Sequence, residues 1–179
     1  GADAVTVAYG SNKATITDGL GTVRTATYQN VLGVMKRASI AQPCVIPGCA
    51  GTVTRSLTYD TFGNLASQTD FNGKKVCYAY DTTNNLETAR VEGVQAELCS
   101  AVLTTLTVRP DIRKISTQWN TPLRLPVKVA EPNRITTYTY NGDGGAYCAA
   151  KSVIGALCRK MLQETTDATG QLGLAAAIT

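Results

Sequence analysis

The stretch that decides the fold lies near the middle of the chain, between residues 59 and 81. It reads Tyr59-Asp60-Thr61-Phe62-Gly63-Asn64-Leu65, then Thr69-Asp70-Phe71-Asn72-Gly73, then Tyr78-Ala79-Tyr80-Asp81. The Tyr-Asp pair recurs after 21 residues, from Asp60 to Asp81. Each Asp-x-x-Gly unit predicts a tight turn, because Gly accepts positive φ and an Asp side chain bonds nearby backbone amides. The stretch therefore predicts consecutive β-hairpins.

Weaker versions of this unit occur toward both ends of the chain. The interval from Asp18 to Tyr28 is ten residues, as is that from Asp70 to Tyr80. A period of about 20 to 50 residues is typical of stacked supersecondary units, none of which buries its apolar face alone. The predicted repeat-turn residues are Asp18, Gly21, Asp60, Gly63, Asp70, Gly73, Asp81, Asp167 and Gly170.

The repeat tyrosines lie in segments rich in Thr, Val and Tyr, which are typical of strands. Strand side chains alternate between two faces, so residues two apart share a face. Apolar or aromatic residues precede these tyrosines by two positions, at Val7, Ala26, Leu57, Tyr78 and Tyr138. We therefore predict a buried stripe on each strand. Its repeat-core residues are Tyr9, Tyr28, Tyr59, Tyr78, Tyr80, Tyr138, Tyr140 and Trp119.

These patterns predict an all-β chain, a meander of stacked β-hairpins with disulfide-stapled loops and at most one short helix, at Lys151 to Leu162. With 179 residues, a single domain over 1–179 is expected. Its expected parts are a repeat (1–30), a cysteine loop of irregular structure (31–52), repeats (53–95), an excursion (96–116), a repeat (117–145), a second cysteine loop (146–160) and a terminal hairpin (161–179).

Six cysteines and no histidine are the next strongest observation. Pairing neighbours along the chain predicts Cys44–Cys49, Cys77–Cys99 and Cys148–Cys158, although six cysteines allow about 15 connectivities. Disulfides imply an oxidising compartment. Zinc is the competing hypothesis, but the chain has no His and no Cys-x-x-Cys pair. A catalytic thiol would lack its usual imidazole partner.

The composition argues against an enzyme. Without His, no Ser-His-Asp or Cys-His triad can form. Asp60, Asp70, Asp81 and Glu87 lie close in sequence, but turn structure explains the aspartates better than acid–base chemistry. A calcium site is a weaker option because the dense Asp-x-Asp-x-Asp spacing is missing. We expect no catalytic residue, no cofactor and no metal.

Charge and hydropathy argue against two classes of partner, nucleic acids and a membrane that the chain would span. The net charge is +4, but the basic residues are scattered, so a nucleic-acid partner is not expected. The longest apolar stretch, Leu172 to Ile178, is too short to span a bilayer, and no signal peptide is visible. We therefore expect a mature product or an excised piece, with no membrane span.

The stretch Tyr59 to Leu86 resembles the YD repeat of the bacterial RHS family, which is also found in teneurins. Segments Thr117 to Pro126 and Glu131 to Asn141 are similar to RHS proteins as well. Outer units depart from the pattern, since Gly10, Gln29 and Asn141 replace the Asp of the Tyr-Asp pair. In that family the repeats spiral into a large β-shell that encloses a toxin or other cargo. This chain is too short to close a shell and lacks the family's C-terminal core motif and any toxin module.

The resemblance implies a structural, non-catalytic segment of a secreted bacterial protein, located outside the cell or on its surface. Its partners would be other YD repeats of a parent chain. An alternative is a standalone subunit whose identical copies stack strands into an extracellular filament, because repeat units leave unpaired edges. We expect those edges at Val5 to Tyr9 and at 170–179. A second alternative is an adhesive or carbohydrate-binding module that contacts a surface glycan.

Overall fold

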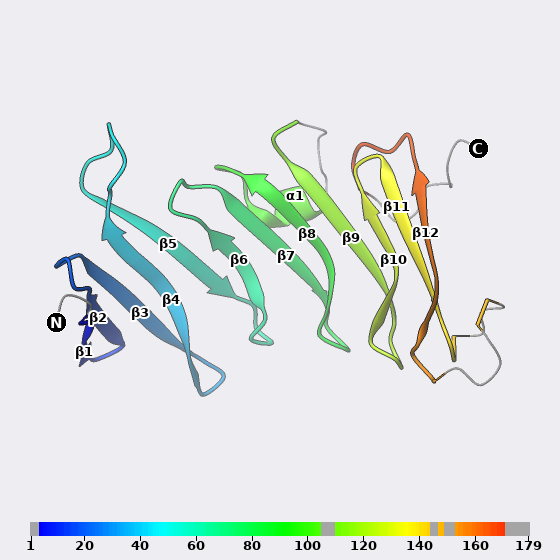
Figure 1. Cartoon of the computed structure of the whole chain (residues 1–179), viewed down its shortest axis with the longest axis horizontal. Coiled ribbons are helices and arrows are strands. Elements are labelled where there is room, and N and C mark those ends of the chain that lie inside the picture. The colour runs from blue at the N-terminus through cyan, green and yellow to red at the C-terminus, as the bar shows by residue number, and fades with distance from the viewer. Residues whose placement is uncertain (1–3, 105–109, 144–146, 149–152, 171–179) are drawn as a thin grey trace. The chain divides into compact units, whose positions relative to one another are not determined.

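The chain folds as an antiparallel meander (Figure 1), seen in a computed structural model that describes residues 4–104, 110–143, 147–148 and 153–170. The strands of the described residues, with one short helix, are β1 (Thr6–Gly10), β2 (Lys13–Thr17), β3 (Val23–Val31), β4 (Val34–Pro43), β5 (Thr52–Tyr59), β6 (Leu65–Thr69), β7 (Lys75–Asp81), β8 (Leu86–Val94), α1 (Cys99–Thr104), β9 (Arg113–Asn120), β10 (Leu125–Glu131), β11 (Arg134–Tyr140) and β12 (Leu157–Glu164).

The strand order in the sheet is the order in the sequence, from β1 to β12. Every pairing of known register is antiparallel and joins consecutive strands, as in Val7 with Ile16 between β1 and β2. Such local pairing follows from short hairpin turns, which bring consecutive strands together without crossovers. The prediction of an all-β meander with one short helix and three disulfides is confirmed.

The chain divides into two compact units, Gly1–Val76 and Cys77–Thr179. The division falls within β7. The first unit holds β1 to β6, and the second holds β8 to β12 together with α1. The expectation of one repeat domain stays a prediction.

In the first unit, the expectation of an irregular loop over 31–52 was wrong for most of its length. Residues Val34 to Pro43 form β4, which pairs with β3 on one side and β5 on the other. Val31 pairs with Val34, so Leu32 and Gly33 make a two-residue turn, with φ of 52° and 82°. A non-Gly residue seldom adopts such a φ, and Leu32 therefore gave no turn signal. Only the part around Cys44 to Gly51 is a loop.

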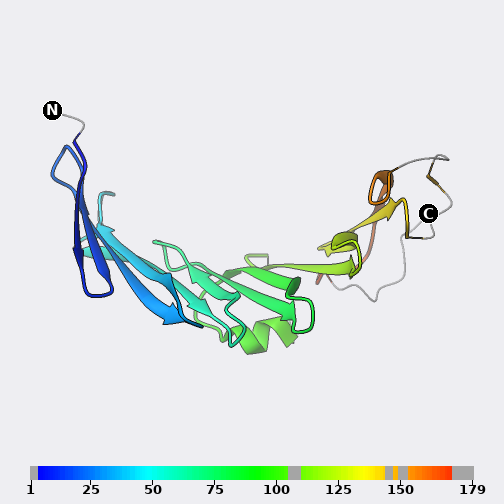
Figure 2. The ribbon, with the colours of Figure 1, turned by 90° about the horizontal axis from the view of Figure 1, so that it is seen from below.

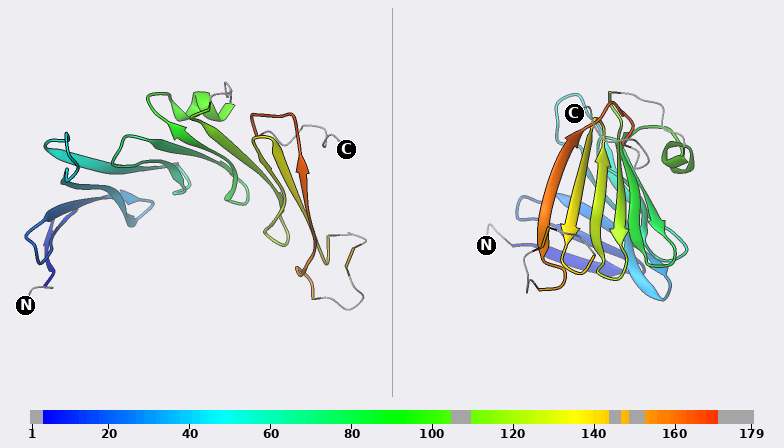
Figure 3. Two further views of the ribbon diagram at one scale, coloured as in Figure 1. Left: turned by 45° about the horizontal axis from the view of Figure 1, so that its top comes forward. Right: turned by 90° about the vertical axis from the view of Figure 1, so that its right-hand side faces the viewer.

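The buried core of the second unit lies between α1 and the strands (Figure 2). Its members are Cys77, Val91, Val94, Val102 and Ile112, with Cys99 and Leu103 packed against them. Figure 3 shows α1 on one face of these strands. A helix of six residues is too short to be stable alone, so it depends on this packing.

Gly93 shapes this core by its backbone conformation. Its φ is +84°, and a side chain there would meet the carbonyl oxygen of Asp111. Val91 and Val94, three residues apart, would lie on opposite faces of a regular strand, yet both are fully buried in the same cluster. The irregular backbone at Gly93 accounts for this, and only Gly fits there.

The helix prediction was wrong in position. The helix is Cys99–Thr104, whereas Leu157 to Glu164 form β12 and pair with β11 from Arg134 to Tyr140. Residues 151 and 152 lie outside the described part of the chain. Gly155, with φ of +83°, ends any helix before β12, and pairing with β11 overrides the helical propensity of the segment.

Two further boundaries are corrected. Arg113 to Ser116, expected in an excursion over 96–116, belong to β9. Met161 to Glu164, expected to begin a terminal hairpin over 161–179, complete β12. The Asp167 to Gly170 turn is present, but the expected second arm and edge strand at 171–179 lie outside the described residues.

Candidate functional site

The repeat turns share one hydrogen-bond pattern. In the turn that begins at Asp60, the Gly63 amide donates to the Asp60 carbonyl at 3.0 Å, and the Asp60 amide donates to the Asn64 carbonyl at 2.9 Å. The Asp60 side chain accepts from the amides of Phe62 and Asn64 at 2.9 and 2.8 Å. The carboxylate therefore holds the turn from inside.

The turns that begin at Asp18 and Asp70 repeat this pattern. Asp18 accepts from the amides of Leu20 and Thr22, and Asp70 accepts from those of Asn72 and Lys74, all at 2.8 to 3.1 Å. Glycine at the fourth position has φ near +80° in each turn, at Gly21, Gly63 and Gly73. Equal geometry at three sites explains why the same residues recur.

Asp81 and Asp167 hold variants of the turn with a different set of bonds. The Asp81 carboxylate accepts from the amide of Thr83 at 2.9 Å and from the side chain of Asn84 at 2.5 Å. The Asp167 carboxylate accepts from the Thr169 amide at 2.8 Å. Gly170 follows with φ of +71°, and a side chain there would collide with the carbonyl oxygen of Lys114. This turn therefore needs Gly for close approach as well as for φ.

Hydrogen bonding lowers the pKa of two turn carboxyls. The backbone amide of Thr22 is the largest influence on the pKa of Asp18, which lies below its usual value. The side-chain bond from Asn84 does the same to the pKa of Asp81. Donors that contact a carboxylate favour its charged form. Both groups therefore stay ionised as parts of a turn, whereas a general acid needs a raised pKa.

The predicted tyrosine core is only partly correct. Tyr140 is buried, and its ring stacks on Tyr138 with 6.3 Å between centroids. Tyr28, Tyr59, Tyr78, Tyr80, Tyr138 and Trp119 are half-buried. Tyr9 is 85% exposed, so its assignment to the core was wrong. It lies on β1, which is the end strand of the sheet and has nothing packed over it in the described part of the chain.

The expected stripe on β7 also lies on the less buried face. Val76, Tyr78 and Tyr80 are half-buried, whereas Cys77 on the opposite face has no exposed surface. The difference arises because α1 covers the Cys77 face. Sequence alternation identified the two faces but could not show which one the helix covers.

Half-buried aromatic residues instead bind backbone groups of neighbouring hairpins. The Tyr59 hydroxyl donates to the Arg37 carbonyl at 2.8 Å, and the Trp119 indole donates to the Glu87 carbonyl at 2.7 Å. Lys36 lies over the Tyr59 ring, 5.1 Å from its centroid, and donates to the Gly63 carbonyl. These contacts hold β4 to β5 and β8 to β9 beyond the residues that pair in their hydrogen-bonded ladders.

The three disulfides join Cys44 to Cys49, Cys77 to Cys99 and Cys148 to Cys158, which is the pairing expected from the sequence. Such bridges are typical of an oxidising compartment. None of the six cysteines remains as a thiol. Among the described residues, no group of three or more His, Cys, Asp or Glu side chains could hold a metal ion.

Strands β8 to β11 carry a row of alternating charges that the sequence analysis missed. Arg113 pairs with Glu92 at 3.7 Å and also with Glu131, which in turn binds Arg134. Burial raises the pKa of Glu131, but the bonds and charges of Arg134 and Arg113 outweigh it and lower that pKa. Glu131 and Arg134 flank one hairpin turn, but Glu92 and Arg113 are far from them in sequence and join the row only through strand register.

Lys114 on β9 is a second missed residue. It is buried, and its amino group donates to the carbonyl of Leu103 at 2.9 Å, which fixes the end of α1. Burial lowers the pKa of Lys114, and the charge of Asp167 opposes this. Lys114 follows Arg113 in the sequence and gave no signal of burial, because its register position opposite Val91 follows from the fold.

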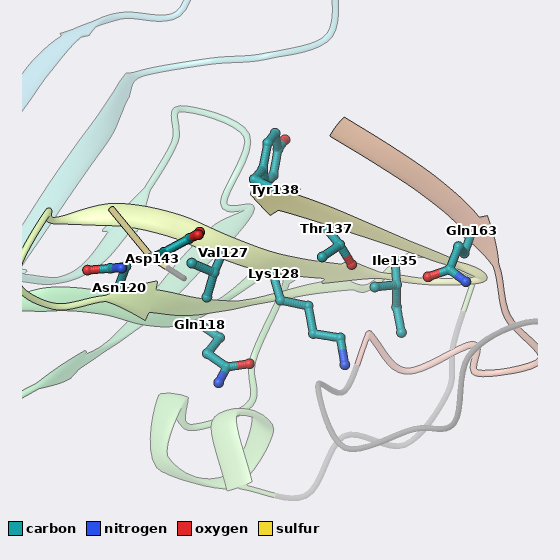
Figure 4. Close-up of a pocket in the computed structure, with 9 residues that line it drawn as sticks. All are labelled: Gln118, Asn120, Val127, Lys128, Ile135, Thr137, Tyr138, Asp143 and Gln163. Carbon is teal, nitrogen blue, oxygen red and sulfur yellow. The ribbon is translucent and has the colours of Figure 1, made fainter. Parts of the chain in front are cut away.

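A polar groove of about 520 Å³ lies on β9 to β12 (Figure 4). Gln118 and Lys128 project toward the side on which α1 lies, and Tyr138 projects to the other side. Asp143 contributes a carboxylate that accepts the Tyr140 amide at 2.8 Å. The groove can donate and accept hydrogen bonds, but it brings no two carboxylates together.

The two end strands differ in charge. All residues of β1 are exposed and none is charged, and Val7 and Tyr9 lie on one face of it, in line with Val5 just before the strand. β12 carries Arg159, Lys160 and Glu164. Charged residues on an end strand disfavour pairing with another chain. β1 is therefore the edge better suited to accept a further strand.

No family model and no curated protein matches the chain. None of the helices in the described segments is long and apolar enough to cross a membrane.

Proposed function

We propose that the chain is a structural, non-catalytic segment of a secreted bacterial RHS or YD-repeat protein, and that it forms part of a β-shell or scaffold. The observation that carries this proposal is the turn that repeats at Asp18, Asp60 and Asp70 with the same bonds each time. Identical turns that join strands in sequence order support a unit that propagates by repetition.

The use of the aspartates supports a structural role. Each repeat-turn carboxylate accepts backbone amides of its own turn, so its oxygens are occupied in holding the hairpin. Three disulfides add covalent links suited to a protein that works outside the cell. The partners in this proposal are further YD repeats, which would pair with β1 and β12.

A second candidate is a filament of identical copies. The uncharged, fully exposed β1 favours it, because an edge without charge can pair with a strand of another copy. A head-to-tail contact that does not close produces an open filament. The two candidates share the edge and differ in what extends it.

One experiment tests the shared edge and separates the candidates. We expect the purified chain to self-associate at high concentration, as measured by light scattering after size exclusion. Val7→Lys should weaken this association, because it charges the exposed edge. Thr54→Lys is the matched control, since Thr54 is an exposed residue of β5, between β4 and β6. Filaments in negative stain would favour the second candidate, and short oligomers the first.

A monodisperse monomer at high concentration, with β1 amides as slow in hydrogen exchange as those of β3, would contradict both candidates.

The proposal that the chain is non-catalytic is tested separately. Glycosidase and nuclease assays on the parent and on Asp70→Asn should show no activity that depends on Asp70. A folded Asp70→Asn protein that loses a robust parental activity would overturn it.

A further inference from the structure

Three connections of the first unit lie at the same end of its strands. In a meander every second connection returns to the same end, so the β2–β3 turn, the β4–β5 loop and the β6–β7 turn share one end. Figure 1 shows the β4–β5 loop and the β6–β7 turn on the upper side of the view, and the β2–β3 turn at the left, at the upper end of β3. Their central residues are unusually apolar, and we name Leu20, Val45, Ile46 and Phe71 the apolar turn edge.

Side-chain contacts join these connections into one surface. Arg24 lies 3.7 Å from the Asp18 carboxylate of the first turn and donates to the Gln42 side chain at 3.3 Å. Gln42 in turn lines a groove of about 520 Å³ with Pro43, Val53, Phe71 and the Cys44–Cys49 loop. The surface is therefore continuous from the Asp18 turn to the Asp70 turn.

The apolar side chains of this edge protrude and are held in place. Leu20 is 93% exposed, Val45 77% and Ile46 60%. The Cys44–Cys49 disulfide closes the loop, and the Cys44 amide donates to the Gly51 carbonyl at 2.9 Å. The Asp18 carboxylate fixes the Leu20 turn through the Leu20 amide at 3.1 Å. Ordered turns that expose aliphatic side chains to water indicate a surface that binds another molecule or a membrane.

The charges around the edge have a small positive excess, three cations against two carboxylates, and the excess lies at Lys74 and Lys75 because Arg24 is beside Asp18. Segments 18–24, 42–53 and 70–75 contain Arg24, Lys74 and Lys75 against Asp18 and Asp70. Both carboxylates are bound to the backbone amides of their own turns. Cations beside protruding aliphatic residues match the interface of a membrane, where anionic headgroups lie above the acyl chains.

We propose that the apolar turn edge docks on the surface of an anionic phospholipid membrane, with Leu20, Val45 and Ile46 inserted among the lipids and Lys74 at the headgroups. A lipid surface is the occupant that fits, because the aliphatic side chains protrude beside the Lys74 and Lys75 pair, and a fluid lipid layer needs no pre-shaped pocket to receive them. This role goes beyond the proposed scaffold function and does not depend on it. It would attach the scaffold to a membrane without spanning it.

The test is co-sedimentation of the full chain with vesicles of phosphatidylglycerol and phosphatidylcholine, mixed at about one to two. Binding should weaken roughly tenfold in Val45→Ser/Ile46→Ser, because two inserted aliphatic side chains are lost. The control is Val153→Ser/Ile154→Ser, a second Val-Ile pair between bridged cysteines that is 78% and 71% exposed. This control should bind like the parent.

Charge is tested separately. Lys74→Gln should weaken binding about fivefold, and Lys13→Gln, an exposed Lys at the other end of the strands, should not. Pure phosphatidylcholine vesicles should bind less than the anionic mixture. The proposal is overturned if the parent does not sediment with anionic vesicles, or if the Val153 and Ile154 control loses as much binding as the Val45 and Ile46 variant. Circular dichroism of each variant excludes loss of fold as the cause.

Discussion

Two disulfides of this chain differ in burial and in the elements that they connect. Cys77–Cys99 lies in a core of fully buried valines and ties α1 to the strands of the second unit. Cys44–Cys49 closes a short surface loop whose central side chains, Val45 and Ile46, face solvent. The first bridge joins elements that no hydrogen-bonded ladder connects, whereas the second only shapes a turn. Equal chemistry therefore has unequal consequences for stability.

Removing the two bridges should separate them most clearly. Cys77→Ala/Cys99→Ala should lower the free energy of unfolding by about 3–5 kcal/mol, because it opens a long loop and frees a helix too short to be stable alone. Cys44→Ala/Cys49→Ala should cost about 2 kcal/mol or less, because its loop is short. Urea unfolding under non-reducing conditions measures both. Equal losses would show that α1 does not depend on its bridge.

The sequence predicted the hairpins and the cysteine pairs but not the helix position. Asp-x-x-Gly turns and neighbouring cysteines are local signals, because the residues that make the contacts are close in sequence. The Leu32-Gly33 turn was missed since Leu rarely adopts positive φ. The charge row from Glu92 to Arg134 depends on strand register, which no local pattern contains. The covered face of β7 depends on α1, whose Cys99 lies 22 residues after Cys77.

Two tyrosines, Tyr140 in the second unit and Tyr9 in the first, differ in burial as the two disulfides do. Tyr140→Ala should lower the free energy of unfolding by about 3 kcal/mol, because its ring is buried and stacked on Tyr138. Tyr9→Ala should change it by less than about 0.5 kcal/mol, because Tyr9 is exposed on the end strand. Thermal unfolding of a monomeric sample measures both changes. A large loss in Tyr9→Ala would mean that β1 is covered in solution.

The smallest expected effect concerns pH and compares a turn carboxyl of the first unit with a strand carboxyl of the second. Amide donors lower the pKa of Asp18 in the folded chain, with Thr22 the largest influence. A carboxyl with a lowered folded pKa adds stability above its unfolded pKa, near 3.8, and that stability is lost as the pH falls toward and below the folded value. Asp18→Asn should therefore flatten the decline in stability between about pH 5 and pH 3.

The Glu87 carboxyl should change the pH dependence of stability in the direction opposite to Asp18. Burial raises its pKa above 4.5, so its ionised form is less favourable in the folded chain than in the unfolded chain. The folded state gains from a protonated Glu87 at low pH, and this gain disappears as the pH rises through the folded pKa. Glu87→Gln should therefore stabilise the protein slightly at neutral pH and leave it unchanged in acid. Unfolding by urea over the same pH series measures both variants. If Asp18→Asn and Glu87→Gln shifted the pH profile in the same direction, the two carboxyls would share one environment, contrary to the amide donors around Asp18 and the burial of Glu87.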